Sequence, residues 1–150
     1  MDQSFHLRVR VVICSKERSQ ILVVRQKGGR HVFLPGGHYE VGESLQDTAV
    51  RETREELGIT VVSKCYLGVV ENDWVDLNTH QYEINHVFEV IPTETLSESQ
   101  NPNSREDHLE FLWISTDDFE KENLLPTNLR EPLKQYLATG LSNPWYILNS

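Results

Sequence analysis

Runs of apolar and β-branched residues divide the chain into segments with the length and composition of β-strands. They cover residues 7–14, 21–25 and 31–34 in the first part of the chain, and 60–70, 82–90 and 111–114 further on. Short runs of this kind, bounded by polar or glycine-containing turns, predict strands. The two longer strands, 60–70 and 82–90, are separated by a polar stretch at 76–80 that we expect to be a loop.

One long helix is predicted between residues 45 and 57, a stretch without proline or glycine. Ser44 is placed to cap its first turn, and Asp47 follows three residues later, close to a capping box. Gly58 is a suitable residue to end it. At about 100° per residue, the expected apolar face comprises Leu45, Ala49, Val50, Thr53 and Leu57. The side expected to face water comprises Asp47, Arg51 and Arg54.

The second half of the chain adds further helices and an irregular segment. Residues 92–107 are rich in Ser, Thr, Asn, Pro and Glu, which predicts a mobile loop. Residues 115–118 are expected to cap a short helix. Another helix is expected from about 127 to 138, with Pro132 tolerated in its first turn. The pattern predicts a mixed α/β fold.

Three glutamates fall on one side of the helix predicted at 45–57. Glu52, Glu55 and Glu56 share an arc of roughly 100°, because residues three and four apart are neighbours on a helix surface. That arc overlaps the edge of the apolar face, where partial burial would raise the carboxylate pKa values. A divalent cation would offset the repulsion, and Mg²⁺ prefers such oxygen ligands. The simpler alternative is a solvated acidic face, which is common in a chain of net charge −9.

The residues around this helix favour the metal interpretation. The segment 37–59 reads GHYEVGESLQDTAVRETREELGI, and its positions at fixed spacing are Gly37, Glu43, Arg51, Glu52, Glu55, Glu56 and Gly58. This spacing resembles the signature of the Nudix hydrolases. The resemblance implies an α/β/α sandwich with a mixed β-sheet, formed as a single domain over residues 1–150. It also implies metal-dependent cleavage of a diphosphate bond in a nucleoside diphosphate linked to another moiety, X.

The same resemblance assigns roles within the segment. The expected ligands of Mg²⁺, or of Mn²⁺ as the alternative metal, are Glu52, Glu55, Glu56 and, through its main-chain carbonyl, Gly37. Glu43 is expected to bond Arg51, which would orient the carboxylates without touching substrate. Thr53 departs from the family pattern, where this position is normally aliphatic, and should weaken the packing slightly without affecting the ligands.

The general base of the implied reaction stays open between a carboxylate of the helix and one of a later loop. Family members differ on whether a helix glutamate such as Glu52 or an acidic residue of a later loop serves. The segment 104–110 supplies the loop candidates Glu106 and Glu110, and the catalytic set that we predict is Glu52, Arg51 and Glu106. The six histidines are scattered without the spacing of metal ligands, so we expect them to be structural.

An acidic protein that acts on a polyanion needs local positive charge. The hairpin-like turn at 25–31 carries several basic residues, and we predict that Arg25 and Arg30 bind the substrate, Arg25 by a bidentate contact with a phosphate. The alternative is a solvated basic turn between two strands. Trp74 or Tyr82 could stack on a nucleobase, and the alternative for each is a place in the core.

Two alternative functions stay open. The substrate could be another diphosphate, such as a nucleotide sugar, a dinucleoside polyphosphate, an oxidised nucleoside triphosphate or a non-nucleotide compound. Residues 75–77, downstream of the signature, match no subclass marker clearly. The second alternative is a catalytically silent Nudix-like module that binds and senses a nucleotide. Such modules usually lose one or more of the signature glutamates, and all of them are present here.

Composition and charge limit the partners and the cellular location that we expect for the protein. A sequence pI of about 5.1 argues against a general nucleic-acid-binding surface. The first residues lack the apolar core of a secretion signal, and no apolar run approaches about 18 residues. We therefore expect a cytoplasmic protein without membrane contact, in which Cys14 and Cys65 are buried thiols, although a disulfide between them stays open. The apolar tail at 142–148 either packs on the domain or forms a homodimer contact.

Overall fold

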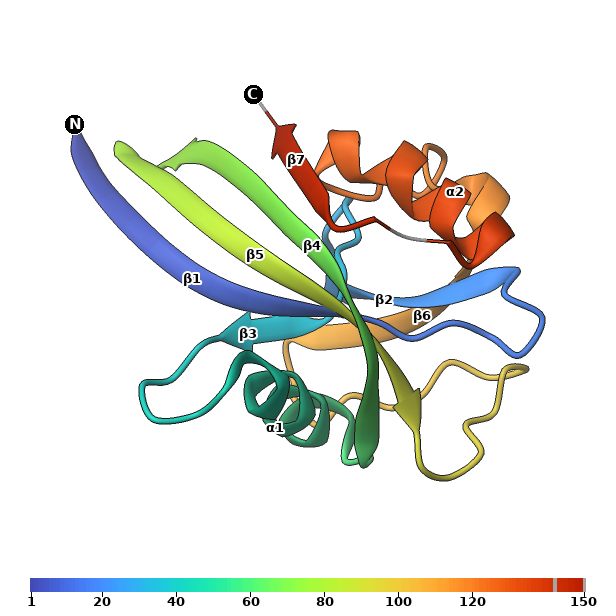
Figure 1. The fold of residues 1–150 in the computed structure, drawn as a ribbon. Helices are drawn as coiled ribbons and strands as arrows, with labels where there is room; N and C mark the ends of the chain where they lie inside the picture. Colours follow the sequence, from blue (N-terminus) through green and yellow to red (C-terminus); the bar gives the residue numbers. More distant parts are fainter. Residues whose placement is uncertain (142, 150) are drawn as a thin grey trace.

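The computed structural model describes residues 1–141 and 143–149 of the chain. Figure 1 shows the elements coloured along the sequence. In chain order they are β1 (Asp2–Val12), β2 (Gln20–Gln26), β3 (Gly36–His38), α1 (Leu45–Leu57), β4 (Val61–Asp76), β5 (Thr79–Pro92), β6 (Leu109–Ser115), the 3₁₀ turns η1 (Thr116–Asp118) and η2 (Thr127–Leu129), α2 (Arg130–Thr139) and β7 (Trp145–Asn149).

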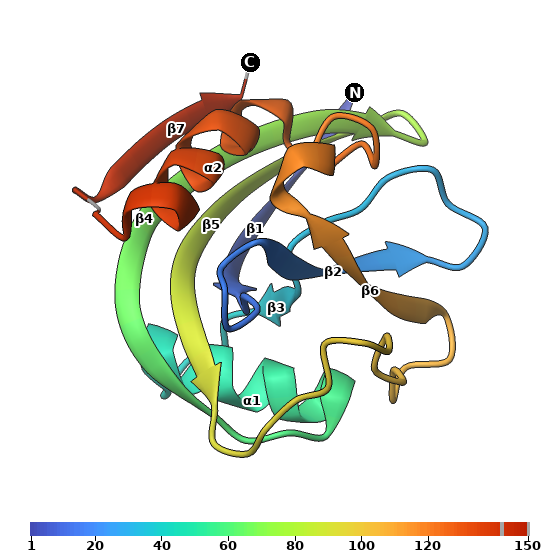
Figure 2. The same ribbon diagram turned by 90° about the vertical axis from the view of Figure 1, so that its right-hand side faces the viewer.

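The strands form one large mixed sheet and one small antiparallel sheet. The large sheet has the order β3-β1-β5-β4-β7, and β2 pairs with β6 separately. The pairs β1–β5 and β4–β7 are parallel, whereas β1–β3 and β4–β5 are antiparallel. In Figure 2 the large sheet curves around the small one, with α1 and α2 near opposite ends of the curve. The predicted α/β architecture with a mixed sheet is confirmed.

Single strands contribute to two hydrophobic cores. Val11 of β1 belongs to the core against α1, whereas its neighbour Val12 belongs to the core against α2. Ile21 and Leu22 of β2 divide between the two cores in the same way. Because successive side chains of a strand point to opposite faces, β1 and β2 each contribute to both cores. The core against α1 positions that helix on the sheets.

The caps predicted for α1 are present. The Ser44 hydroxyl accepts a hydrogen bond from the Asp47 N–H, and the Asp47 carboxylate accepts one from the Ser44 N–H. Gly58 ends the helix with a φ of 71°, in the left-handed region that favours glycine. Thr53 is buried, and its hydroxyl donates to the carbonyl of Ala49 at 2.8 Å. The polar atom of this unusual core residue is thus satisfied, as buried polar groups generally are.

The strand expected at 31–34 is not formed. Only isolated bridges join Val32 to Leu124 and Phe33 to Val24, and the next named strand is β3. Val32 and Leu34 are nevertheless buried in the core against α2. The apolar residues of this run mark a buried segment. Irregular segments of the core can be as apolar as strands, so the run alone did not distinguish the two.

The polar stretch at 76–80 is not a loop of that length. β4 and β5 continue to Asp76 and from Thr79, joined by the two residues Leu77 and Asn78, whose φ values are 48° and 62°. Two-residue turns with positive φ match the twist of a hairpin. The sequence did not predict this extension, because the prediction of strands relied on apolar runs and most residues at the end of the hairpin are exposed and polar.

The apolar tail packs on the domain. β7 pairs in parallel with residues 68–72 of β4, and Ile147 is buried against the core. Tyr146 and Leu148 point the other way and are exposed. Ser142, which the predicted tail segment included, lies outside the described residues.

Both cysteines carry free thiols and are half-buried, so the expectation of full burial is wrong and the disulfide that the sequence left open is not formed. The Cys65 sulfur lies 3.2 Å from the hydroxyl of Tyr136, and the Cys14 sulfur lies 3.8 Å from a carboxylate oxygen of Glu89. Both thiols thus border the buried cluster around Glu89.

Glu89 is a charged residue inside the core. It is 2% exposed, accepts a 2.5 Å hydrogen bond from the Tyr136 hydroxyl, and forms ion pairs with Arg18 at 3.3 Å and Lys64 at 3.4 Å. Burial disfavours its charge, but the hydrogen bonds from Tyr136 and Arg18 outweigh burial and lower the pKa of Glu89. The cluster ties α2 to the large sheet through a carboxylate that is stable only when ionised and paired.

We expect Glu89→Gln to lower the free energy of unfolding at pH 7 by about 1.5–3 kcal/mol, the range for hydrogen bonds to charged groups. The pKa of Glu89 is lower in the folded protein than the ordinary value of 4.5 that applies to the unfolded chain, so the ionised carboxylate stabilises the fold above about pH 4.5. This stabilisation is lost as pH falls through the folded-state pKa. The difference between wild type and variant should therefore shrink below about pH 4.5. Urea unfolding from pH 3 to 8 measures it, with exposed Glu94→Gln as control. A difference that grows on acidification would contradict this account.

Candidate active site

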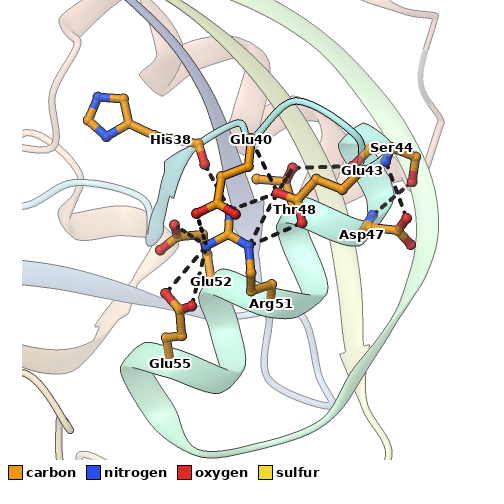
Figure 3. A network of polar contacts seen from close by, with 9 residues as sticks. All are labelled: His38, Glu40, Glu43, Ser44, Asp47, Thr48, Arg51, Glu52 and Glu55. Carbon is orange, nitrogen blue, oxygen red and sulfur yellow. Dashed lines mark hydrogen bonds and ion pairs between the residues drawn. The ribbon is translucent and has the colours of Figure 1, made fainter.

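The signature glutamate and arginine hold a loop against α1. Arg51 donates from Nη2 to Glu43 at 2.7 Å and from Nε to both oxygens of the same carboxylate at 3.1 and 3.2 Å. The same guanidinium donates to the His38 carbonyl at 2.9 Å. The hydrogen bonds from Arg51 and then Thr48 lower the pKa of Glu43 to about 2. Figure 3 shows this network, in which the predicted Glu43–Arg51 pair is confirmed.

The other end of the Arg51 guanidinium reaches the carboxylates further along the helix. Nη1 lies 2.9 Å from Glu52 and 3.4 Å from Glu55, and Glu40 approaches it at 3.7 Å. Arg51 is therefore half-buried among four carboxylates, and the expectation that it faces water is wrong (Figure 3). Charge attraction toward the glutamates outweighs the solvation of the guanidinium. This arrangement orients Glu52 and Glu55 from one side.

Glu56 is the most unusual group of the site. It is 5% exposed, and among the described residues its Oε2 has no hydrogen-bond partner. Burial, followed by the nearby charge of Glu52, raises the pKa of Glu56 to about 8. A buried carboxylate oxygen without a partner is costly and is the kind of group that a cation would satisfy.

Glu52 lies directly against the backbone of Gly37. A Cβ built on Gly37 would fall 2.3 Å from the carboxyl carbon of Glu52, so only glycine leaves room for this side chain in its present position. Burial raises the pKa of Glu52, although hydrogen bonds from Arg51 oppose the change. The structure thus brings together Gly37, Glu52 and Glu56, three of the four predicted metal ligands. The fourth, Glu55, is half-exposed and turned toward Arg51.

The loop before β6 places Glu106 near the helix carboxylates. Glu106 exerts a charge effect on both Glu52 and Glu56. The Arg105 N–H donates to the Glu56 carbonyl at 2.7 Å, which fixes this loop to the end of α1. Its rival, Glu110, instead forms a 2.7 Å ion pair with Arg25 across β2 and β6. Of the two loop candidates, only Glu106 lies beside the helix carboxylates.

The donor set fits a small, hard divalent ion. Within the described part of the chain, no three or more His, Cys, Asp or Glu side chains are arranged to hold a metal by themselves. Mg²⁺ usually takes only one or two carboxylates and completes its shell with water and substrate phosphates. The buried, unpartnered oxygen of Glu56 beside Glu52 and the Gly37 backbone meets that requirement.

Next to Glu56 opens a cleft of about 710 Å³, within the range of small-molecule sites. One wall is the large sheet, and the other comes from β2, the 33–36 segment and the residues around η2. The lining residues are Arg8, Arg10, Val24, Gln26, Phe33, Leu34, Gly36, Glu56, Val70, Asn72, Asp73, Trp74, Asp76, Glu83, Asn85, Val87, Leu109, Leu125, Pro126, Leu129 and Asn149. The walls combine apolar and aromatic side chains with polar and charged groups, as ligand pockets do.

The arginines predicted to bind substrate do not line this cleft. Val24 and Gln26 face it, so Arg25 between them points to the other side of β2, toward Glu110. Arg30 is exposed in the turn after β2. The cations that line the cleft are Arg8 and Arg10 of β1. The alternation of these two arginines with buried valines was a signal in the sequence, but it does not reveal which strand β1 pairs with.

Neither aromatic candidate for base stacking is a core residue. Trp74 is 38% exposed and lines the cleft near the end of the β4–β5 hairpin. Tyr82 is 37% exposed and stacks on His80, with ring centroids 4.2 Å apart. The structure therefore brings Trp74 to the candidate site and leaves Tyr82 outside it.

A curved mixed sheet with a glutamate-rich helix at the mouth of a cleft defines a class of protein, and comparison with known families agrees. A family model described as NUDIX domain matches residues 4–138. The chain belongs to the Nudix family. This family generally uses divalent metal ions, usually Mg²⁺.

Curated relatives resemble part of the chain. The ADP-ribose pyrophosphatase of Methanocaldococcus jannaschii is 34% identical over 76 residues, which is 49% of this chain and 45% of that protein. The 8-oxo-dGTP diphosphatase of Escherichia coli is 36% identical over 58 residues, 36% of this chain and 45% of that protein. In both cases the chain spans less than half of the relative's length.

Solved structures show the same fold over nearly the whole chain. The MutT protein from Methanosarcina mazei Go1 superposes with a TM-score of 0.68 at 23% identity, covering 93% of this chain and 98% of that chain. A UDP-X diphosphatase gives a TM-score of 0.65 at 21% identity, covering 91% and 64%. Among the described residues, no helix combines the length and apolar character needed to cross a membrane.

Proposed function

We propose that this protein is a metal-dependent hydrolase that cleaves the diphosphate bond of a nucleoside diphosphate linked to another moiety. One observation carries the proposal: a buried carboxylate oxygen of Glu56 that has no partner within residues 1–141 and 143–149, beside Glu52 and at the edge of a ligand-sized cleft. A protein without a cation at this point would bear the cost of that burial for no structural gain.

The residues that would hold Mg²⁺ are Glu52, Glu56 and the main-chain carbonyl of Gly37, with Glu55 as a further ligand. Mn²⁺ has the same ligand preferences and is the alternative metal. When bound, such an ion polarises a phosphoryl oxygen and lowers the pKa of a coordinated water. Arg51 keeps Glu52 and Glu55 in place and holds the loop of Glu43 and His38 against the helix.

Glu106 is the general base in this proposal. Glu52 is a metal ligand in this proposal and is held by a 2.9 Å hydrogen bond from Arg51, so the loop carboxylate is the one left to accept the proton. Glu106 lies near the same carboxylates from the opposite loop, where it can accept a proton from the attacking water. Substituting Glu106 with Gln should lower kcat with little effect on KM.

Trp74 is placed to stack on the nucleobase. Aromatic stacking on a base contributes about 1–3 kcal/mol, judged by alanine substitution, so Trp74→Ala should raise KM about tenfold or more while kcat stays within about twofold. Tyr82→Ala is the matched control, because Tyr82 has a similar exposure but lies outside the cleft. Equal changes in KM for the two variants would count against this role of Trp74.

Product analysis tests the function itself. The protein is incubated with Mg²⁺ and, separately, with ADP-ribose, nucleotide sugars, dinucleoside polyphosphates and nucleoside triphosphates. Cleavage of one of them into phosphate-bearing products supports the proposal and identifies X. Tight binding of one compound without turnover would replace it with a nucleotide-sensing module.

A further inference from the structure

We propose that Arg8 is the residue that binds a substrate phosphate in the cleft, and that Glu83 positions it. This inference rests on the proposed function, because it concerns the same cleft. It replaces the role that the sequence assigned to Arg25 and Arg30, neither of which lines the cleft.

The guanidinium of Arg8 is held at the cleft wall but incompletely bonded. Its Nε lies 3.0 Å from Glu83, yet among the described residues this buried atom makes no hydrogen bond of acceptable geometry. The side chain is 22% exposed and lines the cleft. A guanidinium fixed with its Nε toward Glu83 can present its Nη donors to a phosphate in the cleft and bind it through two parallel hydrogen bonds.

Arg8 and Arg10 share one buried carboxylate in the cleft wall. Glu83 is 7% exposed and accepts a hydrogen bond from Asn85 at 3.0 Å. Arg8 and Arg10 both approach this carboxylate, at 3.0 and 3.9 Å. Arg8 therefore shares its carboxylate with a second guanidinium, whereas Arg10 also lies near the charges of Glu56 and Glu52. An anionic ligand would give Arg8 a partner of its own.

The guanidinium of Arg10 already makes hydrogen bonds within the fold, so Arg8 is the arginine available to a ligand. Arg10 donates to Asn85 at 3.0 Å and to the carbonyl of Leu34 at 3.2 Å. That second bond ties β1 to the segment leading into β3. Arg10 therefore supports the wall, whereas Arg8 faces the cleft with fewer bonds.

The rest of the cleft would repel a phosphate. Apart from Arg8, Arg10, Glu56 and Glu83, its charged lining residues are Asp73 and Asp76 near the hairpin end, and Asp73 already binds His80 at 2.6 Å. Arg8 pairs in register with Asn85, and Trp74 with Gln81. These levels are separated by about 13 Å along β5 at 3.3 Å per residue. A nucleotide can therefore place its phosphate at Arg8 and its base toward Trp74.

Kinetics and direct binding test the inference together. Arg8→Gln should raise KM about 10–100-fold, the loss expected for a hydrogen-bonded charge, with kcat changed less than threefold. Calorimetric titration of ADP in EDTA should show the same loss of affinity. Arg8→Lys keeps the positive charge but lacks the parallel donors of the guanidinium. Its KM and its affinity for ADP should lie between those of wild type and Arg8→Gln. Arg25→Gln, which removes a cation outside the cleft, should leave both quantities unchanged.

Glu83 has its own test as a positioning residue. Glu83→Gln should weaken ADP binding and raise KM while the melting temperature shows that the protein still folds, and Glu83→Asp should restore part of the affinity. Equal ADP affinity in wild type and Arg8→Gln would overturn the inference, as would equal losses in Arg8→Gln and Arg25→Gln. Because the titration needs neither metal nor turnover, its result is distinct from failure of the hydrolase proposal.

Discussion

Glu56→Gln is expected to lower kcat about a thousandfold or more without destabilising the metal-free protein. A metal ion contributes several kcal/mol to stabilising the charge of a phosphoryl transition state, and each 1.36 kcal/mol corresponds to a factor of ten in rate. The amide has nearly the shape of the carboxylate but lacks its charge. Steady-state kinetics with Mg²⁺ and thermal melting in EDTA measure the two effects.

The stability result separates a functional role for Glu56 from a structural one. In the part of the chain that the structure describes, its Oε2 lacks a hydrogen-bond partner, and burial raises the pKa of this carboxyl group. A variant with a neutral amide should therefore melt at the same or a higher temperature in EDTA. Exposed Glu120→Gln serves as the control and should change neither property. A variant that melts well below wild type would mean that the carboxylate supports the fold itself.

Gly37→Ala is expected to lower kcat about a hundredfold. The added methyl would occupy the place of the Glu52 carboxylate, 2.3 Å from its carboxyl carbon, so Glu52 must move. Misplacing a catalytic group by about 1 Å can cost about 10²-fold in rate. The displaced group is the end of a flexible side chain, and the melting temperature should therefore change little.

Gly28→Ala provides the opposite signature. Gly28 has a φ of 83° with nothing within 4 Å of an added Cβ, so alanine there is strained but meets no neighbour. We expect a lower melting temperature and unchanged kinetics, since the left-handed region is unfavourable for alanine. If both glycine variants lost activity in proportion to their stability, the contact between Gly37 and Glu52 would have no separate role.

The local features of the site were predictable because they depend on neighbours in sequence. The capping box of Ser44 and Asp47, the stop at Gly58 and the pairing of Glu43 with Arg51 all lie within one helix and the loop before it. Side-chain spacing on a helix determines such contacts almost independently of the rest of the fold. The mixed α/β architecture followed from the order of the runs together with the family resemblance.

The residues of the cleft were not predictable in this way, because strand pairing joins distant segments. Arg8 reaches the site only since β1 lies beside β5, more than seventy positions along the chain. The sequence favoured Arg25 because its turn is basic, but the alternation of β2 turns that side chain away from the cleft. Likewise, the two-residue turn at Leu77 and Asn78 extends the hairpin that carries Trp74.

The family does not specify the substrate of this protein. The relatives are named for ADP-ribose in one case and 8-oxo-dGTP in another, and each matches only part of its length. In the proposed function, selection among diphosphates depends on the cleft wall, which Arg8, Glu83 and Trp74 line.

The most direct measurement is the rate of hydrolysis of the best compound of the substrate panel as a function of Mg²⁺ concentration, in wild type and Glu56→Gln side by side. The proposed site predicts a saturable dependence on Mg²⁺ in wild type, loss of the rate in EDTA, and no recovery of the variant at any Mg²⁺ concentration. A wild-type rate that persists in EDTA, or a variant as fast as wild type, would contradict a metal held by the glutamates of α1.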